Sequence, residues 1–250
     1  MFDSGTMFAM ETSSDTPIPE PPWNVRSSQR DHTARAPLSR EAIVDAALTV
    51  VGREGAQGLN MRRVAEELGT GPASLYWHVA SKDELANLMV DRVMGEIELP
   101  PPDPARWQEQ LKEFGLQAWR LFQRYPGVAG LTLGRIPIGP NLIRLTEWNL
   151  SLLRGAGIPD RMAAFAGDLF GLFLGAHGLE QAAGFSSPTG EDLPPEEIVR
   201  MVRGYFGSMP PDRFPNVLAT LDELVAGGPE ERFELGLDVL IRGLASYIER

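Results

Sequence analysis

Residues 59–79, LNMRRVAEELGTGPASLYWHV, decide how the first part of this chain folds. Asn60 is a good helix cap, and the apolar residues that follow it recur at helical spacing as far as Leu68. Gly69 permits a sharp reversal, and Pro72 suits the first turn of a new helix, which we expect to end near His78. Two short helices joined by a few glycine-containing residues predict a helix-turn-helix, although structural helical hairpins share this pattern.

Helices are also predicted on both sides of this stretch. Ser39 can cap a helix that closes at Gly52 and Gly55, and its apolar residues would share a core with the two short helices. Ser81 can cap a longer helix that continues to about Glu98 and stops at three consecutive prolines. The result is a three-helix head followed by one connecting helix.

The rest of the chain keeps a helical pattern, punctuated by proline and glycine. No alternating strand pattern extends beyond a few residues, and no internal repeat is evident. The predicted fold class is therefore all-α, with a small N-terminal head and a larger helical body. The candidate helices of the body are residues 104–124, a short piece near 127–134, 140–155, 160–183, 195–208, 214–226 and 229–249.

Composition narrows the possible classes of protein. The chain has 250 residues, of which 43% are hydrophobic, enough for a sizeable buried core. It has no cysteine, which excludes a disulfide framework, a thiolate zinc site and a cysteine nucleophile. No run approaches the roughly 18 apolar residues that span a bilayer, and the acidic N-terminus is unlike a signal peptide. We therefore expect a cytoplasmic protein without a membrane partner.

The net charge of −11, taken alone, argues against nucleic acid as a partner. The charge is unevenly distributed, however. Residues 1–25 hold four acids and no bases, residues 26–92 hold nine of each, and residues 93–250 hold 14 bases and 21 acids. The segment with the predicted helix-turn-helix is therefore neutral within an acidic chain, and arginines gather at its start.

A family resemblance sharpens this interpretation. Residues 59–69, together with SLYWHV at 74–79 and SKDEL at 81–85, resemble the DNA-binding head of TetR-family transcriptional regulators. Residues 103–250 resemble, more weakly, the C-terminal domain of the tetracycline-repressor branch. The resemblance implies a homodimeric repressor that binds a palindromic DNA operator in the major groove and is released by a small-molecule ligand. Its domains would be a flexible extension at 1–36, a helix-turn-helix domain at 37–85, and a ligand-binding and dimerisation domain at 86–250.

The head offers two kinds of DNA contact. Arginine is the commonest bidentate partner of guanine, so Arg62 is the main candidate for reading bases, with a solvated or phosphate-bound arginine as the alternative. The exposed start of the third helix adds only small contacts, from Pro72, Ala73 and Ser74. The residues that resemble backbone-contacting positions are Tyr76, His78 and Lys82, with packing between the head helices as the alternative for Tyr76. Trp77 is a further candidate for a DNA contact. For Trp77, packing between the head helices is an equally good explanation.

Three arginines precede the head, at Arg26, Arg30 and Arg35. An arm of this kind can enter an adjacent minor groove, and a solubilising linker is the alternative.

Dimerisation and ligand binding are both expected of the body. The resemblance implies dimerisation through residues 160–183 and 229–249, and the many small residues of the first suit close approach across a two-fold axis or within one subunit. Aromatic residues between helices suit an apolar or aromatic effector, although such residues are more often core. The candidate pocket residues are Trp107, Trp119, Phe122, Trp148, Phe170, Phe173 and His177.

Two other functions remain open. One is a DNA-binding regulator without a small-molecule ligand, acting constitutively or through a protein partner. The other is a helical enzyme or metal protein, for which His177 and Glu180, one helical turn apart, are the only local hint. The chain has no nucleophile elbow and no phosphate-binding glycine loop. We therefore expect no enzymatic activity, no metal and no cofactor.

Overall fold

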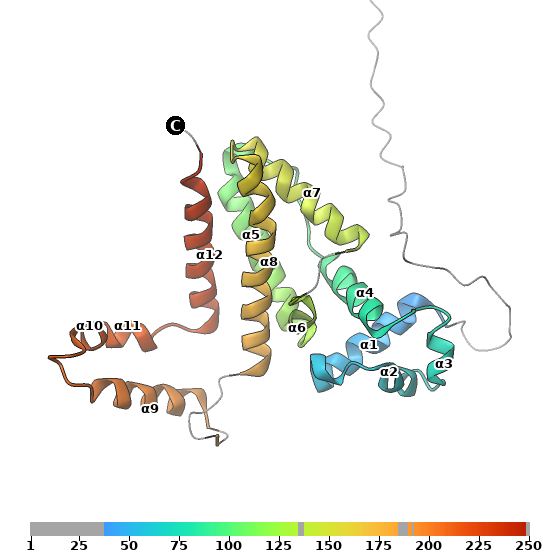
Figure 1. Ribbon diagram of the computed structural model, residues 1–250, viewed down its shortest axis with the longest axis horizontal. Coiled ribbons are helices and arrows are strands. Elements are labelled where there is room, and N and C mark those ends of the chain that lie inside the picture. The colour runs from blue at the N-terminus through green and yellow to red at the C-terminus, as the bar shows by residue number, and fades with distance from the viewer. Residues whose placement is uncertain (1–37, 135–137, 185–189, 192, 249–250) are drawn as a thin grey trace, which may run out of the picture.

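The structure is a computed structural model that describes residues 38–134, 138–184, 190–191 and 193–248. These residues form helices and no strands, which confirms the predicted all-α class. In Figure 1 the head lies at one end of the molecule, the body in the middle and a helical arm at the other end. The predicted extension at 1–36, with Arg26, Arg30 and Arg35, lies outside the described residues.

The head has the predicted order of helices, and its caps are those expected. The side chains of Ser39, Asn60 and Ser81 each accept a hydrogen bond from a backbone N–H of the first turn that follows. The third helix ends three residues earlier than predicted, because the N–H groups of His78 and Val79 both donate to the Leu75 carbonyl and form a turn. The elements are α1 (Arg40–Glu54), η1 (Ala56–Gly58), α2 (Met61–Glu67), α3 (Pro72–Leu75) and α4 (Lys82–Met94).

The helices of the body follow the predicted pattern closely. Two of the predicted ranges, 140–155 and 160–183, match the observed helices residue for residue. The elements are η2 (Pro104–Arg106), α5 (Trp107–Arg124), α6 (Val128–Thr132), α7 (Pro140–Gly155), α8 (Asp160–Ala183), α9 (Pro195–Gly207), α10 (Pro215–Ala219), α11 (Leu221–Val225) and α12 (Pro229–Ala245).

Two predicted helices differ in extent. The range 214–226 is split into α10 and α11 at Thr220, whose hydroxyl donates to the Asn216 carbonyl at 2.8 Å. The connecting helix α4 ends at Met94 rather than near Glu98, because the following carbonyls bond to a side chain of α7 instead of continuing the helix.

One continuous hydrophobic core joins the head to the body. Leu85 and Met89 of α4 are fully buried, so this helix contributes to the packing of both parts. The short helix α6 lies between them. A Cβ placed on Gly130 would approach Ala56 of the head at 3.2 Å and Leu179 of α8 at 3.3 Å. The head therefore rests on the body through α4 and α6.

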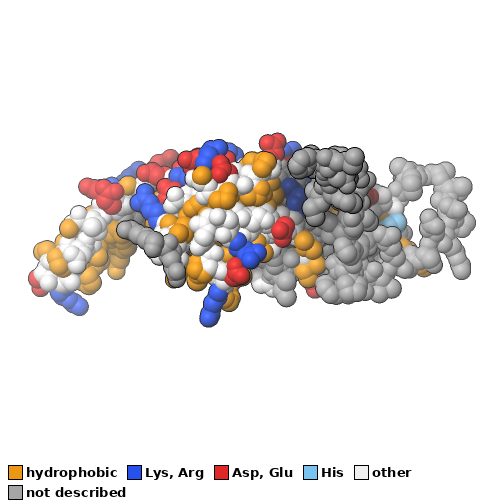
Figure 2. All heavy atoms as spheres, turned by 90° about the horizontal axis from the view of Figure 1, so that it is seen from above, with side chains coloured by type: hydrophobic (Ala, Val, Ile, Leu, Met, Phe, Trp, Pro, Cys, Tyr) orange, Lys and Arg blue, Asp and Glu red, His pale blue; other side chains and the backbone are white. Residues whose placement is uncertain are grey.

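The segment from α9 to α11 forms an arm that leaves the lower end of α8 and returns to α12 (Figure 1). Among the described residues of this arm, only Ile198 is buried. Figure 2 shows hydrophobic side chains among charged ones at this end of the molecule. The arm thus exposes apolar surface that the rest of the described chain does not cover.

Helix α8 combines length with high hydropathy. Among the described residues it is the one helix long and apolar enough, by length and composition, to cross a membrane, with a mean hydropathy of 1.4. Only 33% of its most apolar window is buried. Its apolar residues lie on two faces of the helix. One face packs against the body, and the other face is exposed.

Candidate DNA-binding and ligand sites

The turn between α2 and α3 depends on Gly69. Its φ of 61° lies in the left-handed region that favours glycine, and its N–H donates to the Glu66 carbonyl at 3.1 Å. The next N–H, of Thr70, donates to the Ala65 carbonyl at 2.9 Å. This closure of α2 turns the chain so that Pro72 can begin α3 at its first position.

The base-reading candidates lie on the surface of this helix-turn-helix. The Arg62 side chain is 83% exposed on α2. Pro72 and Ala73 are exposed at the start of α3, while Ser74 is partly buried. The start of α3 therefore presents small contacts, and Arg62 is the only long basic side chain among these candidates.

The candidate phosphate contacts follow directly along the chain. Tyr76 is 52% and Trp77 is 69% exposed, His78 is partly buried, and Lys82 is exposed at the start of α4. The exposure of Trp77 disfavours the alternative in which it packs between the head helices. All eight candidates that the structure describes thus lie on α2, on α3, in the turn that follows α3 or in the first turn of α4.

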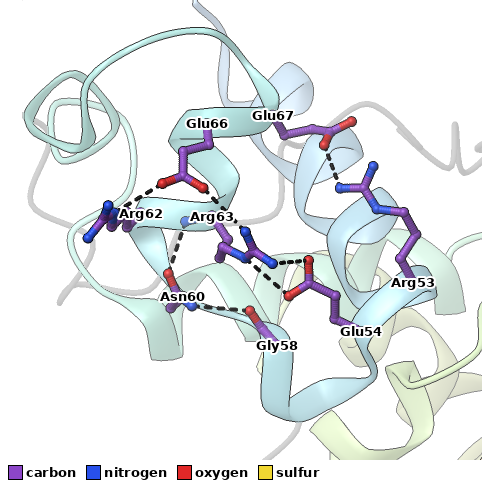
Figure 3. Close-up of polar contacts among 8 residues, drawn as sticks. All are labelled: Arg53, Glu54, Gly58, Asn60, Arg62, Arg63, Glu66 and Glu67. Carbon is purple, nitrogen blue, oxygen red and sulfur yellow. Dashed lines mark hydrogen bonds and ion pairs between the residues drawn. The ribbon is translucent and has the colours of Figure 1, made fainter.

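Ion pairs that the sequence analysis did not predict cross the head (Figure 3). Arg63 pairs with Glu54 of α1 at 2.9 Å and with Glu66 at 3.5 Å, and Glu66 accepts a hydrogen bond from Nε of Arg62 at 3.0 Å. Hydrogen bonding to Glu54 raises the pKa of Arg63, so its charge is maintained. The three- and four-residue spacings from Arg63 and Arg62 to Glu66 are the sequence signal that could have revealed part of this chain.

A separate ion pair joins α1 to α4. Nη2 of Arg40 lies 2.8 Å from Oε1 of Glu84, and its Nε donates to the His78 carbonyl. Glu84 also accepts a hydrogen bond from the Ala80 N–H at 2.6 Å. These bonds hold the segment after α3, which carries the candidate phosphate contacts, in one position.

Part of the predicted pocket forms an aromatic cluster in the body. The ring of Trp119 on α5 stacks on Phe233 of α12 with centroids 4.6 Å apart. Phe173 and His177 of α8 pack on Phe233 at 5.4 and 5.6 Å, and on each other at 4.5 Å. Phe233 was missing from the prediction, because nothing in the sequence places α12 opposite these two helices.

The Trp119 side chain carries an unusual feature within this aromatic cluster. Trp119 is 1% exposed, and its Nε1 is buried without a hydrogen-bond partner in the structure. A buried N–H without an acceptor costs free energy, so such a group calls for an explanation. An acceptor atom of a bound molecule would satisfy it.

The other pocket candidates lie elsewhere in the body. Trp148 packs against Phe114, and its Nε1 donates to the Pro100 carbonyl at 2.7 Å. Phe122 lies against Gly178, where an added Cβ would be 2.8 Å from its ring. Trp107 and Phe170 are buried in the same continuous core.

The two helices expected to form a dimer both expose apolar side chains. The exposed large residues are Phe165, Leu169, Leu172 and Leu179 on α8, and Leu235 and Val239 on α12. The small residues of α8 are divided between two roles. Gly175 and Gly178 are buried against α6 and α5 within the same chain, whereas nothing lies within 4 Å of a Cβ built on Gly171. Close packing within one subunit therefore explains the first two glycines.

The proposed metal hint is not strengthened by the structure. His177 Nδ1 lies 3.8 Å from Glu180 Oε2. In the part of the chain that is described, no group of three or more His, Asp or Glu side chains could hold a metal ion.

An exposed helix-turn-helix joined by a shared helix to a larger helical body defines the class of two-domain DNA-binding regulators. Comparison with known proteins agrees. Residues 43–89 match the family model described as "Bacterial regulatory proteins, tetR family", and residues 99–248 match "Tetracyclin repressor-like, C-terminal domain". The chain belongs to the TetR family of transcriptional regulators, a non-enzymatic family.

Individual relatives show the same likeness. The structure of apo ActR from Streptomyces coelicolor is 38% identical, with a TM-score of 0.76 over 86% of this chain and 98% of its own. ActR has also been solved in complex with actinorhodin. The class C tetracycline repressor of Escherichia coli is 28% identical over 83% of this chain and 90% of its length. A regulator of Saccharopolyspora erythraea is 34% identical over 52% of this chain, which spans only 56% of that relative.

Proposed function

We propose that this protein is a homodimeric transcriptional repressor that binds a palindromic operator and is released by a small-molecule effector. The observation that carries the proposal is the exposure of Arg62, Tyr76, Trp77 and Lys82 around a helix-turn-helix. The helix that follows it, α4, is also a core helix of the body. Such a head inserts its recognition helix into the major groove. We expect a cytoplasmic location, where the DNA is.

The DNA contacts divide by chemistry. Arg62 can make a bidentate contact to guanine, while Pro72, Ala73 and Ser74 make small contacts at the start of α3. Tyr76, Trp77, His78 and Lys82 contact the phosphate backbone and fix the register. If Arg26, Arg30 and Arg35 reach the minor groove, they add affinity rather than a precise sequence preference.

The dimer interface is formed by the exposed faces of α8 and α12. Phe165, Leu169 and Leu172 are spaced so that they share one face of α8, and Leu235 and Val239 do the same on α12. Contiguous exposed apolar surface of this kind marks an interaction site. A two-fold axis through it would present two heads to successive major grooves, about 34–36 Å apart or at a related spacing.

The effector site includes the cluster of Trp119, Phe173, His177 and Phe233. Its rings suit a largely apolar or aromatic molecule, and the unpartnered Nε1 of Trp119 suits a hydrogen-bond acceptor on that molecule. The complex of the relative ActR with actinorhodin supports a small-molecule effector of this general kind.

Effector binding reaches the head through α6 and α4. Gly178 of α8 packs on Ala129 of α6, whose neighbour Gly130 approaches Ala56 of the head. A small displacement near His177 is therefore passed to elements that touch α1. The effector lowers operator affinity only if it binds better to the conformation that cannot bind DNA, with a typical coupling of about 5- to 150-fold.

The second candidate is a DNA-binding regulator without a small-molecule effector. It is favoured by the direct stacking of Trp119 on Phe233, since the cluster then fills its own space. Operator binding that no planar aromatic compound weakens, in a body that takes up none of them, would support this candidate.

The experiment that tests the function is selection of random double-stranded DNA on the purified full chain at a fixed, near-physiological salt concentration. An enriched inverted repeat supports the dimeric operator reader. If protein freed of small molecules by unfolding and refolding enriches no sequence, the proposal is wrong.

A further inference from the structure

Arg62 is highly exposed, yet its guanidinium is not left to rotate freely. Its Nε donates to Oε1 of Glu66, one turn further along α2, at 3.0 Å. Because this bond uses Nε, the terminal nitrogens Nη1 and Nη2 keep their donors for another partner. A bidentate contact to O6 and N7 of guanine needs two donors of this kind.

Glu66 is itself held from the other side. Its Oε2 lies 3.5 Å from Nη1 of Arg63, and Arg63 reaches Glu54 on α1 through two nitrogens, Nε at 3.2 Å and Nη2 at 2.9 Å. The N–H of Arg63 is fixed by the Asn60 cap. Figure 3 shows the side chains of Glu54, Arg63, Glu66 and Arg62 in one line.

Of the four side chains in this line, Glu54 is the least exposed and the candidate base reader Arg62 is the most exposed. The Glu54 side chain is 29% exposed, Arg63 51%, Glu66 48% and Arg62 83%. The line is thus anchored at Glu54 on α1, and it ends at Arg62, on the surface where DNA would approach. A highly exposed arginine without such support loses side-chain entropy when it binds, which lowers both its affinity for a base and its discrimination between bases.

We propose that Glu66, supported by Arg63 and Glu54, is a positioning residue that aims Arg62 at a guanine, and so determines the sequence specificity of the head. The proposal rests on the proposed function, in which Arg62 reads a base. Glu66 also places a negative charge near the phosphates. Its removal therefore raises affinity for DNA of any sequence while it lowers discrimination, which is a signature that loss of folding cannot produce.

The test compares Glu66→Ala with Glu67→Ala. Glu67 is the neighbouring residue of α2 and carries the same charge, but it pairs with Arg53 at 2.6 Å. The probe is the operator recovered from random-DNA selection, with each base pair replaced in turn. The readout is the ratio of Kd values for the replaced and intact operators, with unrelated DNA measured alongside.

We expect Arg62→Ala to lose roughly 5- to 150-fold discrimination at one guanine, the usual range for a bidentate contact. Glu66→Ala should lose part of it, on the order of fivefold, at that base pair alone. Glu67→Ala should leave every ratio unchanged. Both Glu66→Ala and Glu67→Ala should bind unrelated DNA more tightly, because each removes a negative charge. Arg63→Ala and Glu54→Ala should change the same ratio as Glu66→Ala, by less.

The outcomes separate this inference from the proposed function. If Arg62→Ala loses discrimination and Glu66→Ala keeps it, positioning by Glu66 is refuted while base reading by Arg62 stands. If Arg62→Ala keeps every ratio, both base reading by Arg62 and its positioning fail. Should Glu66→Ala not fold, Glu66→Met serves in its place, since it removes both the charge and the oxygen acceptor of Arg62 Nε and nearly preserves the size of the side chain.

Discussion

Asp91, near the end of the helix that leaves the head, accepts a hydrogen bond from the backbone N–H of Leu142, in the first turn of α7, at 3.0 Å. Its second oxygen accepts a hydrogen bond from Asn141 at 3.0 Å. In return, Arg144 of α7 donates to the carbonyls of Gly95 and Ile97 that follow α4. The end of α4 and the start of α7 thus satisfy each other's unpaired backbone groups.

Loss of this contact should destabilise the protein. Asp91 is only 7% exposed, so Asp91→Ala leaves the donors of α7 without a partner. We expect the free energy of unfolding to fall by about 1–3 kcal/mol, measured by urea denaturation. Asp45→Ala, at an exposed site on α1, should change it by less than about 0.5 kcal/mol. Equal effects of the two variants would contradict this role for Asp91.

Gly139, which precedes α7, should be intolerant of a side chain. A Cβ built on it would lie 2.2 Å from Oδ1 of Asp91. We therefore expect Gly139→Ala to destabilise the protein to a similar extent and to be less than additive with Asp91→Ala. A double-mutant cycle of unfolding free energies measures this, and full additivity would show that the residues act independently.

Base reading and phosphate binding should respond differently to mutation. Arg62→Ala should cost about 1–3 kcal/mol at one base pair, and Lys82→Ala should weaken all sequences alike while reducing the salt slope by about 1. Binding titrations on the selected operator and on unrelated DNA, at several salt concentrations, distinguish the two. If both variants show the same pattern, the division of roles is wrong.

The dimer depends on the exposed face of α8. Leu172→Asp places a charge on a side chain that is 51% exposed, so the monomer should fold normally while association fails. Light scattering after gel filtration should report a monomer, and operator affinity should fall strongly. Ile143→Asp, at a 48% exposed site on α7, is the matched control and should remain dimeric. A dimeric Leu172→Asp protein would place the interface elsewhere.

The unpartnered indole should matter for the effector and not for folding. Trp119→Phe keeps an aromatic ring against Phe233 and removes the buried N–H, so its unfolding free energy should not drop by the full 3–5 kcal/mol or so expected of a cavity. Affinity for a planar aromatic effector with a carbonyl acceptor should decrease by roughly 5- to 10-fold, corresponding to one hydrogen bond. Isothermal titration measures it. Unchanged affinity would remove Trp119 Nε1 from the effector site.

The stability at alkaline pH should depend on Tyr125. Its hydroxyl donates to Glu96 at 2.6 Å, and this hydrogen bond raises the pKa of Tyr125 above its ordinary value. The folded state therefore holds the proton more tightly than the unfolded chain. The contribution is complete below about pH 10 and is lost as the pH rises through the folded-state pKa. Tyr125→Phe should unfold more readily at pH 8 and show a weaker decline above pH 10.

The sequence by itself determined the helices and the head. Caps at Ser39, Asn60 and Ser81, the turn at Gly69 and the apolar spacing are local signals, because they act within one or two helical turns. For this reason α7 and α8 were predicted residue for residue. The placement of the DNA-contact candidates around this turn followed from the same pattern, whereas the exposure of Trp77 became clear only in the structure.

Only the tertiary structure decided which distant residues meet. Phe233 stacks on Trp119 although 114 positions separate them, and Asp91 caps a helix that begins 49 residues later. It also divided the small residues of α8, with Gly175 and Gly178 inside the subunit and Gly171 outside. Such contacts depend on how amphipathic helices pack together, and packing is a property of whole surfaces that no local spacing specifies.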